Sequence, residues 1–421
     1  MNGKGSSWHN QALQATLIIA SAILVQCAAA AGVDISSTVS GPQSLLVIAV
    51  RFPGTVPTLT LEQIQEKIGR VDGYIRNASY GKAWLEPKLA GWYDMPAGVD
   101  AYKVSPYNYN VDPARVRRLV ADAVGAAQRD VNLGKYDLVW IVVGVFTYPG
   151  QGYGMICYAA NPGMLSKGLG RGEFRPQLET VALTGGGSFA KPVTVSAENA
   201  HVGHAVHDLL HALGGLKDGR RVLPDLYDFW LQSHPPGGSG FMLPPETYAI
   251  HTGSWDIMSQ HFIERTQPPP APSSFTRLRM GWIAPEQVVS VKAGETREVV
   301  LSPLSSGKDT LVIRVPLAGE RYLLVENRQR SGDDAVQRAA GMLVLEVDPS
   351  RAEGSAIVHT VDANPSVPRL YAAPFLPGAG ERRYYENAAA GIAVIPLELA
   401  TDGSMRVMVT TPDRAKQWRG D

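Results

Sequence analysis

The chain contains very little cysteine. Only Cys27 and Cys157 occur in 421 residues, and Cys27 lies within an N-terminal segment typical of an export signal. Cys157 is then the only cysteine of the mature chain, so we expect no disulfide framework. A lone cysteine is more often a small buried hydrophobic residue than a nucleophile, and we assign Cys157 that role.

The sequence also lacks a net charge. Lysine and arginine together number 39, aspartate and glutamate together number 39, and the formal net charge is zero. A protein that binds nucleic acid or an anionic membrane surface usually carries a basic excess. We therefore expect neither kind of partner.

Long apolar runs are absent after the N-terminus, which excludes a membrane span in the mature chain. The run at residues 15–25 is shorter than the roughly 20 residues that a membrane helix needs. It follows Lys4 and precedes the small residues 28–31, so it predicts a signal peptide over residues 1–31 and a secreted or extracytoplasmic protein. Gln26 stands before Cys27 where a lipoprotein signal needs a small residue, which makes lipid anchoring the less favoured alternative.

The order of the remaining patterns predicts two domains. Up to residue 286, predicted strands at 44–50, 84–93 and 138–145 alternate with helical spacing at 61–75 and with a helix that starts at Asp112-Pro113. This order is typical of an α/β domain with a mixed sheet and helices against it, residues 44–286. Residues 148–191 are rich in glycine and are expected to form a loop with a hairpin. From residue 287, short apolar runs separated by turns predict an all-β, sandwich-like domain, residues 287–421. The predicted strands of this second domain are 298–301, 310–315, 322–326, 342–347, 392–397 and 405–409.

The most informative segment is 196–215, which contains His201, His204, His207 and His211. We expect a helix there, with Ser196 as its N-cap and glycines 214 and 215 as its end. One helical turn brings His211 to within about 40° of His207, so both imidazoles can reach one metal ion. Composition alone would place well under one histidine in such a window, so we favour a metal site over structural histidines. His201 and His204 are expected to lie outside the ligand set.

The sequence of this helix, His207-Asp208-x-x-His211, is similar to the zincin motif His-Glu-x-x-His, with Asp in place of Glu. Other segments extend the similarity in order along the chain. They are 45–52, 79–82 with 91–93, Leu-Pro-Asp-Leu-Tyr-Asp at 223–228, Gly-Ser-Trp-Asp-Ile-Met-Ser at 253–259, Gly-Trp at 281–282, and Leu-Val-Glu-Asn-Arg-Gln at 324–329. Over about residues 45–348 the chain therefore resembles the secreted bacterial metallopeptidases related to immune inhibitor A, the sixth metallopeptidase family.

This resemblance implies a zincin-like catalytic domain in which His207 and His211 bind Zn²⁺. It places Asp225 as the acidic third ligand and Asp208 as the catalytic general base, and it puts Met258 in the turn beneath the metal. Two features depart from the family. Asp208 is one methylene shorter than glutamate, which draws its carboxylate back by roughly 1 to 1.5 Å and can cost about 10²-fold in rate. Residues 216–222 are inserted before the third ligand, so Asp218 competes with Asp225 for that position.

The predicted function is an exported zinc metalloendopeptidase that hydrolyses proteins or peptides, attenuated by Asp208. The alternative is an inactive homologue that acts as a secreted or surface binding protein. Asp228 and Asp256 are candidate calcium ligands, although single acidic loop residues more often cap turns. Trp84, Trp92 and Tyr93 are expected on an edge strand, where packing explains them as well as contact with a substrate does. A peptide substrate is expected to pair with such an edge through its backbone.

Overall fold

The computed structural model describes residues 35–102, 112–147, 157–166, 176–230, 251–259, 267–378 and 383–418. The predicted signal peptide, residues 1–31, lies outside them. Residues 35–421 form one compact unit. No helix in the described ranges is long and apolar enough to cross a membrane.

The first half of this unit contains a mixed five-stranded sheet in the order β2-β1-β3-β7-β4. Strands β1, β2, β3 and β7 are parallel, whereas β4 pairs antiparallel with β7 at one edge. The sheet is confirmed as mixed, and the predicted strand at 84–93 is an edge strand. The bounds are β1 Gly41–Arg51, β2 Ala83–Asp94, β3 Leu138–Val143, β4 Cys157–Asn161 and β7 Val193–Ala197.

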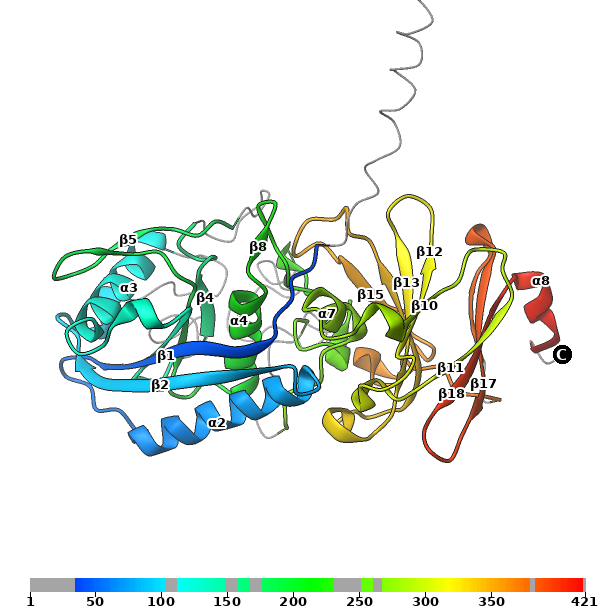
Figure 1. Cartoon of the computed structure of the whole chain (residues 1–421), viewed down its shortest axis with the longest axis horizontal. Helices are drawn as coiled ribbons and strands as arrows, with labels where there is room; N and C mark the ends of the chain where they lie inside the picture. The colour runs from blue at the N-terminus through cyan, green and yellow to red at the C-terminus, as the bar shows by residue number, and fades with distance from the viewer. Residues whose placement is uncertain are drawn as a thin grey trace, which may run out of the picture. The chain divides into compact units, whose positions relative to one another are not determined.

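Helices cover both faces of this sheet (Figure 1). Helices α2, Leu61–Ala78, and α4, Val202–Gly214, share a hydrophobic cluster with one face, and α3, Pro113–Ala127, shares a second cluster with the other. Helix α2 begins with a capping box between Thr60 and Gln63. Helix α3 begins at a proline behind the cap Asp112, as predicted.

The chain after residue 287 forms two antiparallel-rich sheets that face one another. Their orders are β10-β12-β13-β14-β15 and β11-β18-β17-β16, and inward side chains of both sheets form one hydrophobic cluster, as expected for a sandwich. All six predicted strands are present. The bounds are β10 Val288–Ser290, β11 Arg297–Leu301, β12 Val312–Pro316, β13 Tyr322–Arg328, β14 Gly341–Val347, β15 Val358–Thr360, β16 Tyr385–Asn387, β17 Ile392–Leu399 and β18 Met405–Thr410.

The second face of the β13–β14 sheet packs into the same hydrophobic cluster as α2 and α4. Because strand side chains alternate, Leu323 and Val325 face the sandwich interior while Leu324 faces this other cluster. Loop 253–259 and the short helix α7, Ser274–Arg279, add Trp255, Met258 and other apolar side chains between the two layers. The core is thus continuous across residue 286, and the division into domains at that residue stays a prediction.

Two expectations about the segment before α4 are wrong. Ser196 is a buried residue of β7, where its Oγ accepts a hydrogen bond from Trp140 Nε1 at 2.8 Å, and His201 is the N-cap of α4. The alternation of Val193 and Val195 was the signal for a buried strand. Residues 157–161, assigned to a loop, form β4, although a small hairpin does follow, with β5, Val181–Ala182, and β6, Ser188–Phe189.

Packing of α4 in the shared cluster generates a first prediction. Leu209 is 0 % exposed there, whereas Leu399 at the end of β17 is 44 % exposed. We expect Leu209→Ala to lower the free energy of unfolding by about 2–5 kcal/mol, because it removes buried surface and leaves a cavity. Leu399→Ala makes the same chemical change and should cost well under about 1 kcal/mol. Urea denaturation measures both, and equal losses would contradict the position of α4 in the core.

Candidate metal centre

Helix α4 presents the histidine pair from inside the protein. His201 caps its first turn by accepting a hydrogen bond from Gly203 N–H at Nδ1, 3.0 Å away, and Gly215 ends it at a φ of 68°. His207, Asp208 and His211 are all buried, whereas His201 and His204 are partly exposed. The structure therefore places His207 and His211 in the interior and His201 and His204 closer to the surface.

Backbone carbonyls fix both buried imidazoles. His207 Nδ1 lies 2.9 Å from the oxygen of Ile257, and His211 Nδ1 lies 2.7 Å from the oxygen of Leu223. A carbonyl oxygen only accepts, so each Nδ1 carries a proton, and the Nε2 of each neutral ring carries a lone pair. Metal-binding histidines in proteins are usually oriented in this way.

The two Nε2 atoms meet the carboxylate of Asp225. They lie 3.1 Å apart, and Asp225 Oδ1 is 2.9 Å from His207 Nε2 and 3.1 Å from His211 Nε2. Zinc–nitrogen and zinc–oxygen bonds of about 2.0–2.1 Å in a tetrahedron place neighbouring ligand atoms about 3.3 Å apart. The triangle is thus within a few tenths of an ångström of the size that one small cation requires.

Three atoms that carry lone pairs repel one another at this distance unless a positive charge lies among them. Burial lowers the pKa of His207, but its hydrogen bond with Asp225 and the charge of that carboxylate raise the pKa to about 9. Burial and the charge of Arg221 lower the pKa of His211 to about 4. The positive charge that this triangle requires can thus come from a proton on His207 or from a metal ion, and the two compete for the same position.

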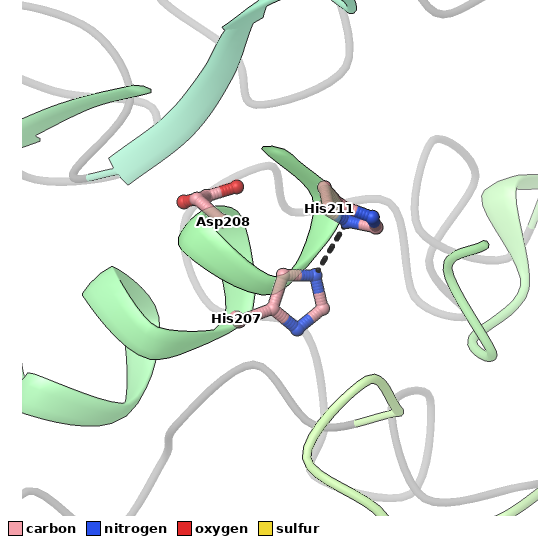
Figure 2. Close-up of side chains that lie close together, drawn as sticks. All are labelled: His207, Asp208 and His211. Atoms are coloured by element: carbon pink, nitrogen blue, oxygen red, sulfur yellow. Dashed lines mark hydrogen bonds between the residues drawn. The ribbon is translucent and has the colours of Figure 1, made fainter. Parts of the chain in front are cut away.

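Asp208 adds a second carboxylate to the group. One ligand atom from each of His207, Asp208 and His211 lies within 4.8 Å of the others, so these buried residues could hold a metal ion. Figure 2 shows the Asp208 carboxylate projecting from α4 apart from the two imidazoles. Burial raises the pKa of Asp208 to about 6, against the charge of His207 and a hydrogen bond with the Cys157 thiol. Cys157 itself is buried, as predicted.

The inserted segment forms a hairpin that carries Asp218 away from the imidazoles. Strands β8, Leu216–Lys217, and β9, Arg220–Arg221, are joined by Asp218 and Gly219, whose φ angles are 51° and 72°. An Asp-Gly pair with positive φ at both residues is typical of a type I′ hairpin turn. Asp218 is exposed at this tip, so the structure brings Asp225 and not Asp218 to the histidines.

Two further charged residues adjoin Asp225, and neither stands out in the sequence. Arg221 Nη1 lies 3.4 Å from Asp225 Oδ2 and 3.1 Å from Glu353 Oε1. Glu353 Oε1 also accepts a hydrogen bond from the Asp225 N–H at 2.9 Å. Burial raises the pKa of Glu353 to about 8, although Arg221 opposes the shift. Glu353 is distant in sequence and has no motif around it, so only the fold reveals it.

Met258 and Asp256 have structural roles, and Asp228, the other calcium candidate, lies 3.4 Å from His251 Nε2 through its Oδ2. Met258 is fully buried, and its carbonyl accepts a hydrogen bond from Leu226 N–H at 3.0 Å, beside the Ile257 carbonyl that holds His207. The Asp256 carboxylate accepts hydrogen bonds from Met258 N–H, Ser273 and Thr276. It caps this turn, as the alternative to calcium binding predicted.

Comparisons with known proteins add no relative. No family model matches the chain, and no curated protein matches it significantly. The interpretation of the site therefore depends on the geometry of the chain itself.

The choice between the two candidate third ligands can be tested by one isosteric change at each. We expect Asp225→Asn to weaken metal binding by more than about 100-fold, the upper end of the effect of losing an outer hydrogen-bond partner. Asp218→Asn should leave the affinity unchanged, because asparagine also suits the hairpin turn. Competition with a chromogenic chelator measures both dissociation constants. A loss of affinity in the Asp218 variant alone would reverse the assignment.

Proposed function

We propose that this protein is a zinc-dependent peptidase with a zincin-like metal site, acting outside the cytoplasm. The observation that carries the proposal is the convergence of His207 Nε2, His211 Nε2 and Asp225 Oδ1 within 3.1 Å of one another. Two imidazoles and one carboxylate are a usual ligand set for catalytic zinc, and this set leaves a position for substrate or water. The proposed location outside the cytoplasm rests on the signal peptide predicted over residues 1–31.

Each residue of the site has a role in the proposed reaction. His207, His211 and Asp225 would hold zinc, which supplies Lewis-acid chemistry by polarising a carbonyl group and lowering the pKa of water toward about 7. Asp208 would accept a proton from the attacking water and donate it to the leaving amine. One water bridges groups up to about 6 Å apart at ordinary hydrogen-bond lengths, and the ligand atoms here span no more than 4.8 Å.

The proposed substrate is a protein or peptide, and pairing of its backbone with an edge of the five-stranded sheet is one way to hold it. Of the two edges of this sheet, β2 and β4, the second adjoins the metal group, since Cys157 at the start of β4 contacts Asp208. An extended peptide can add to such an edge by backbone hydrogen bonds. All five residues of β4 are buried, and the carbonyls of Ala159 and Ala160 accept hydrogen bonds from Met164 and Leu165, so β4 does not offer a free edge. The aromatic residues expected to line a substrate edge lie on β2.

One observation favours a second function, a binding protein without catalytic activity. Residue Asp208 is only 7 % exposed, and its carboxylate already forms a hydrogen bond with the Cys157 thiol. A carboxylate that is short and engaged in this way is a poorer general base than a free glutamate. In this alternative the metal stabilises the fold, and the β-rich segment binds a partner.

The metal content provides the first test. We expect purified mature protein to hold about one zinc per chain, because the donor set is buried and oriented by backbone carbonyls. Elemental analysis after purification without chelators measures it, and addition of zinc to stripped protein should raise the melting temperature. Zinc-free protein that gains no stability from added zinc would count decisively against the site.

The exchange Asp208→Glu decides between enzyme and binding protein. We expect slow hydrolysis of casein by the parent, abolished by a chelator, and a rate about 10-fold or more higher for Asp208→Glu, because the added methylene brings the carboxylate closer to the attacking water. The matched control is Asp218→Glu, which makes the same change on the exposed hairpin. If neither the parent nor the Asp208→Glu variant hydrolyses casein, although both bind zinc and are folded, the peptidase proposal fails and the binding function remains.

A further inference from the structure

Two buried charged residues, Arg221 and Glu353, contact Asp225 on the side away from the imidazoles. The side chains of Arg221, Asp225 and Glu353 are 4 %, 7 % and 7 % exposed, respectively. They are too buried to contact a substrate from solvent, yet they adjoin the carboxylate that completes the metal triangle. Polar groups at such depth are costly to bury unless they are fully hydrogen-bonded.

The contacts restrain Asp225 at three points. Oδ1 faces the two imidazoles, Oδ2 faces Arg221 Nη1, and the backbone N–H donates to Glu353 Oε1. Arg221 Nη1 also donates to the same Glu353 oxygen at 3.1 Å. The carboxylate therefore cannot rotate about its Cβ–Cγ bond without losing the Arg221 contact, and only Oδ1 is directed at the metal position.

The inserted hairpin is what places Arg221 there. Alternation along β9 exposes Arg220 and buries Arg221. The second nitrogen of Arg221, Nη2, donates to the Pro162 carbonyl at 3.3 Å, and a Cβ on Gly163 would lie only 2.7 Å from it. Arg220 donates to the carbonyls of Pro349 and Arg351, which fastens the hairpin to the loop that contains Glu353.

We propose that Arg221 and Glu353 are positioning residues of the metal centre, which hold Asp225 with a single oxygen directed at the metal. This inference rests on the proposed metal site and deepens it. It assigns a function to the insertion, which delivers the guanidinium, and to the loop after β14, which delivers the acceptor oxygen. The chain after residue 287 is then part of the metal centre and not only a binding module.

Exchange of Glu353 tests the acceptor oxygen. We expect Glu353→Ala to weaken zinc binding about 10- to 100-fold, as is usual when an outer partner of a metal ligand is lost. Glu353→Gln keeps an acceptor in place and should bind within about threefold of the parent. The control Glu346→Ala removes a carboxylate of β14 that accepts from Tyr385 at 2.8 Å, and it should leave zinc affinity unchanged. Chelator competition measures all four proteins.

Exchange of Arg221 tests the guanidinium without changing the charge. Lysine carries one compact ammonium and cannot bond to Asp225, Glu353 and Pro162 together, so we expect Arg221→Lys to weaken zinc binding about 10-fold. The control Arg406→Lys makes the same change at an exposed arginine of β18 that pairs with Glu398, and it should bind as the parent does. The visible spectrum of the Co²⁺-loaded protein should also change for Arg221→Lys alone, because it reports the geometry of the ligands, which a general loss of stability would not alter.

The outcomes are separable. Loss of affinity with Glu353→Ala and Arg221→Lys, rescue by Glu353→Gln and a changed cobalt spectrum support the inference. Unchanged affinity in Arg221→Lys, or equal loss in the alanine and glutamine variants, overturns it. If Glu353→Ala does not fold, the comparison of Arg221→Lys with its control decides whether the inference holds. A parent protein that binds neither zinc nor cobalt refutes the metal site itself, which is a different result from a parent that binds metal and variants that match it.

Discussion

Three lone-pair-bearing atoms meet in the buried centre of this protein, and the rest of the structure serves to hold them there. Two imidazoles and one carboxylate lie within 3.1 Å of one another. Without a shared positive charge, electrostatic repulsion in a medium of low polarity would drive them apart. Their proximity therefore requires strong restraint from the fold together with a proton or a metal ion.

The restraint comes from three separate segments of the chain. Helix α4 provides both histidines, segment 223–226 provides Asp225, and loop 253–259 holds His207 through the Ile257 carbonyl. That loop is fixed in turn by the β-rich half, since Arg328 of β13 donates to the Trp255 carbonyl at 3.0 Å and pairs with Glu326 and Asp334. The buried charges of Arg328 are thus satisfied within the protein, as burial demands.

The sequence predicted the elements whose signal is local. Helix α2, the cap of α3, the six β-rich strands and the His207/His211 pair each follow from spacing within a few residues. It missed β4, whose five residues lie between glycine-rich segments, and it assigned Ser196 to a cap although that residue continues β7. Glu353 lies 128 residues from Asp225, and contacts of that separation depend on the fold and leave no pattern in the chain.

The Asp at position 208 does not by itself decide whether the site is catalytic. One water can bridge the group, because its ligand atoms span no more than 4.8 Å, but the aspartate holds its carboxylate farther from that water than a glutamate would. The Cys157 thiol forms a hydrogen bond with the Asp208 carboxylate, and this bond competes with the attacking water for the carboxylate oxygens. A thiol is a weak donor, so this bond removes only part of the basicity of the carboxylate, and burial outweighs it by raising the pKa of Asp208 to about 6, closer to neutrality than that of an exposed aspartate. The local environment thus supplies part of what the missing methylene would have provided.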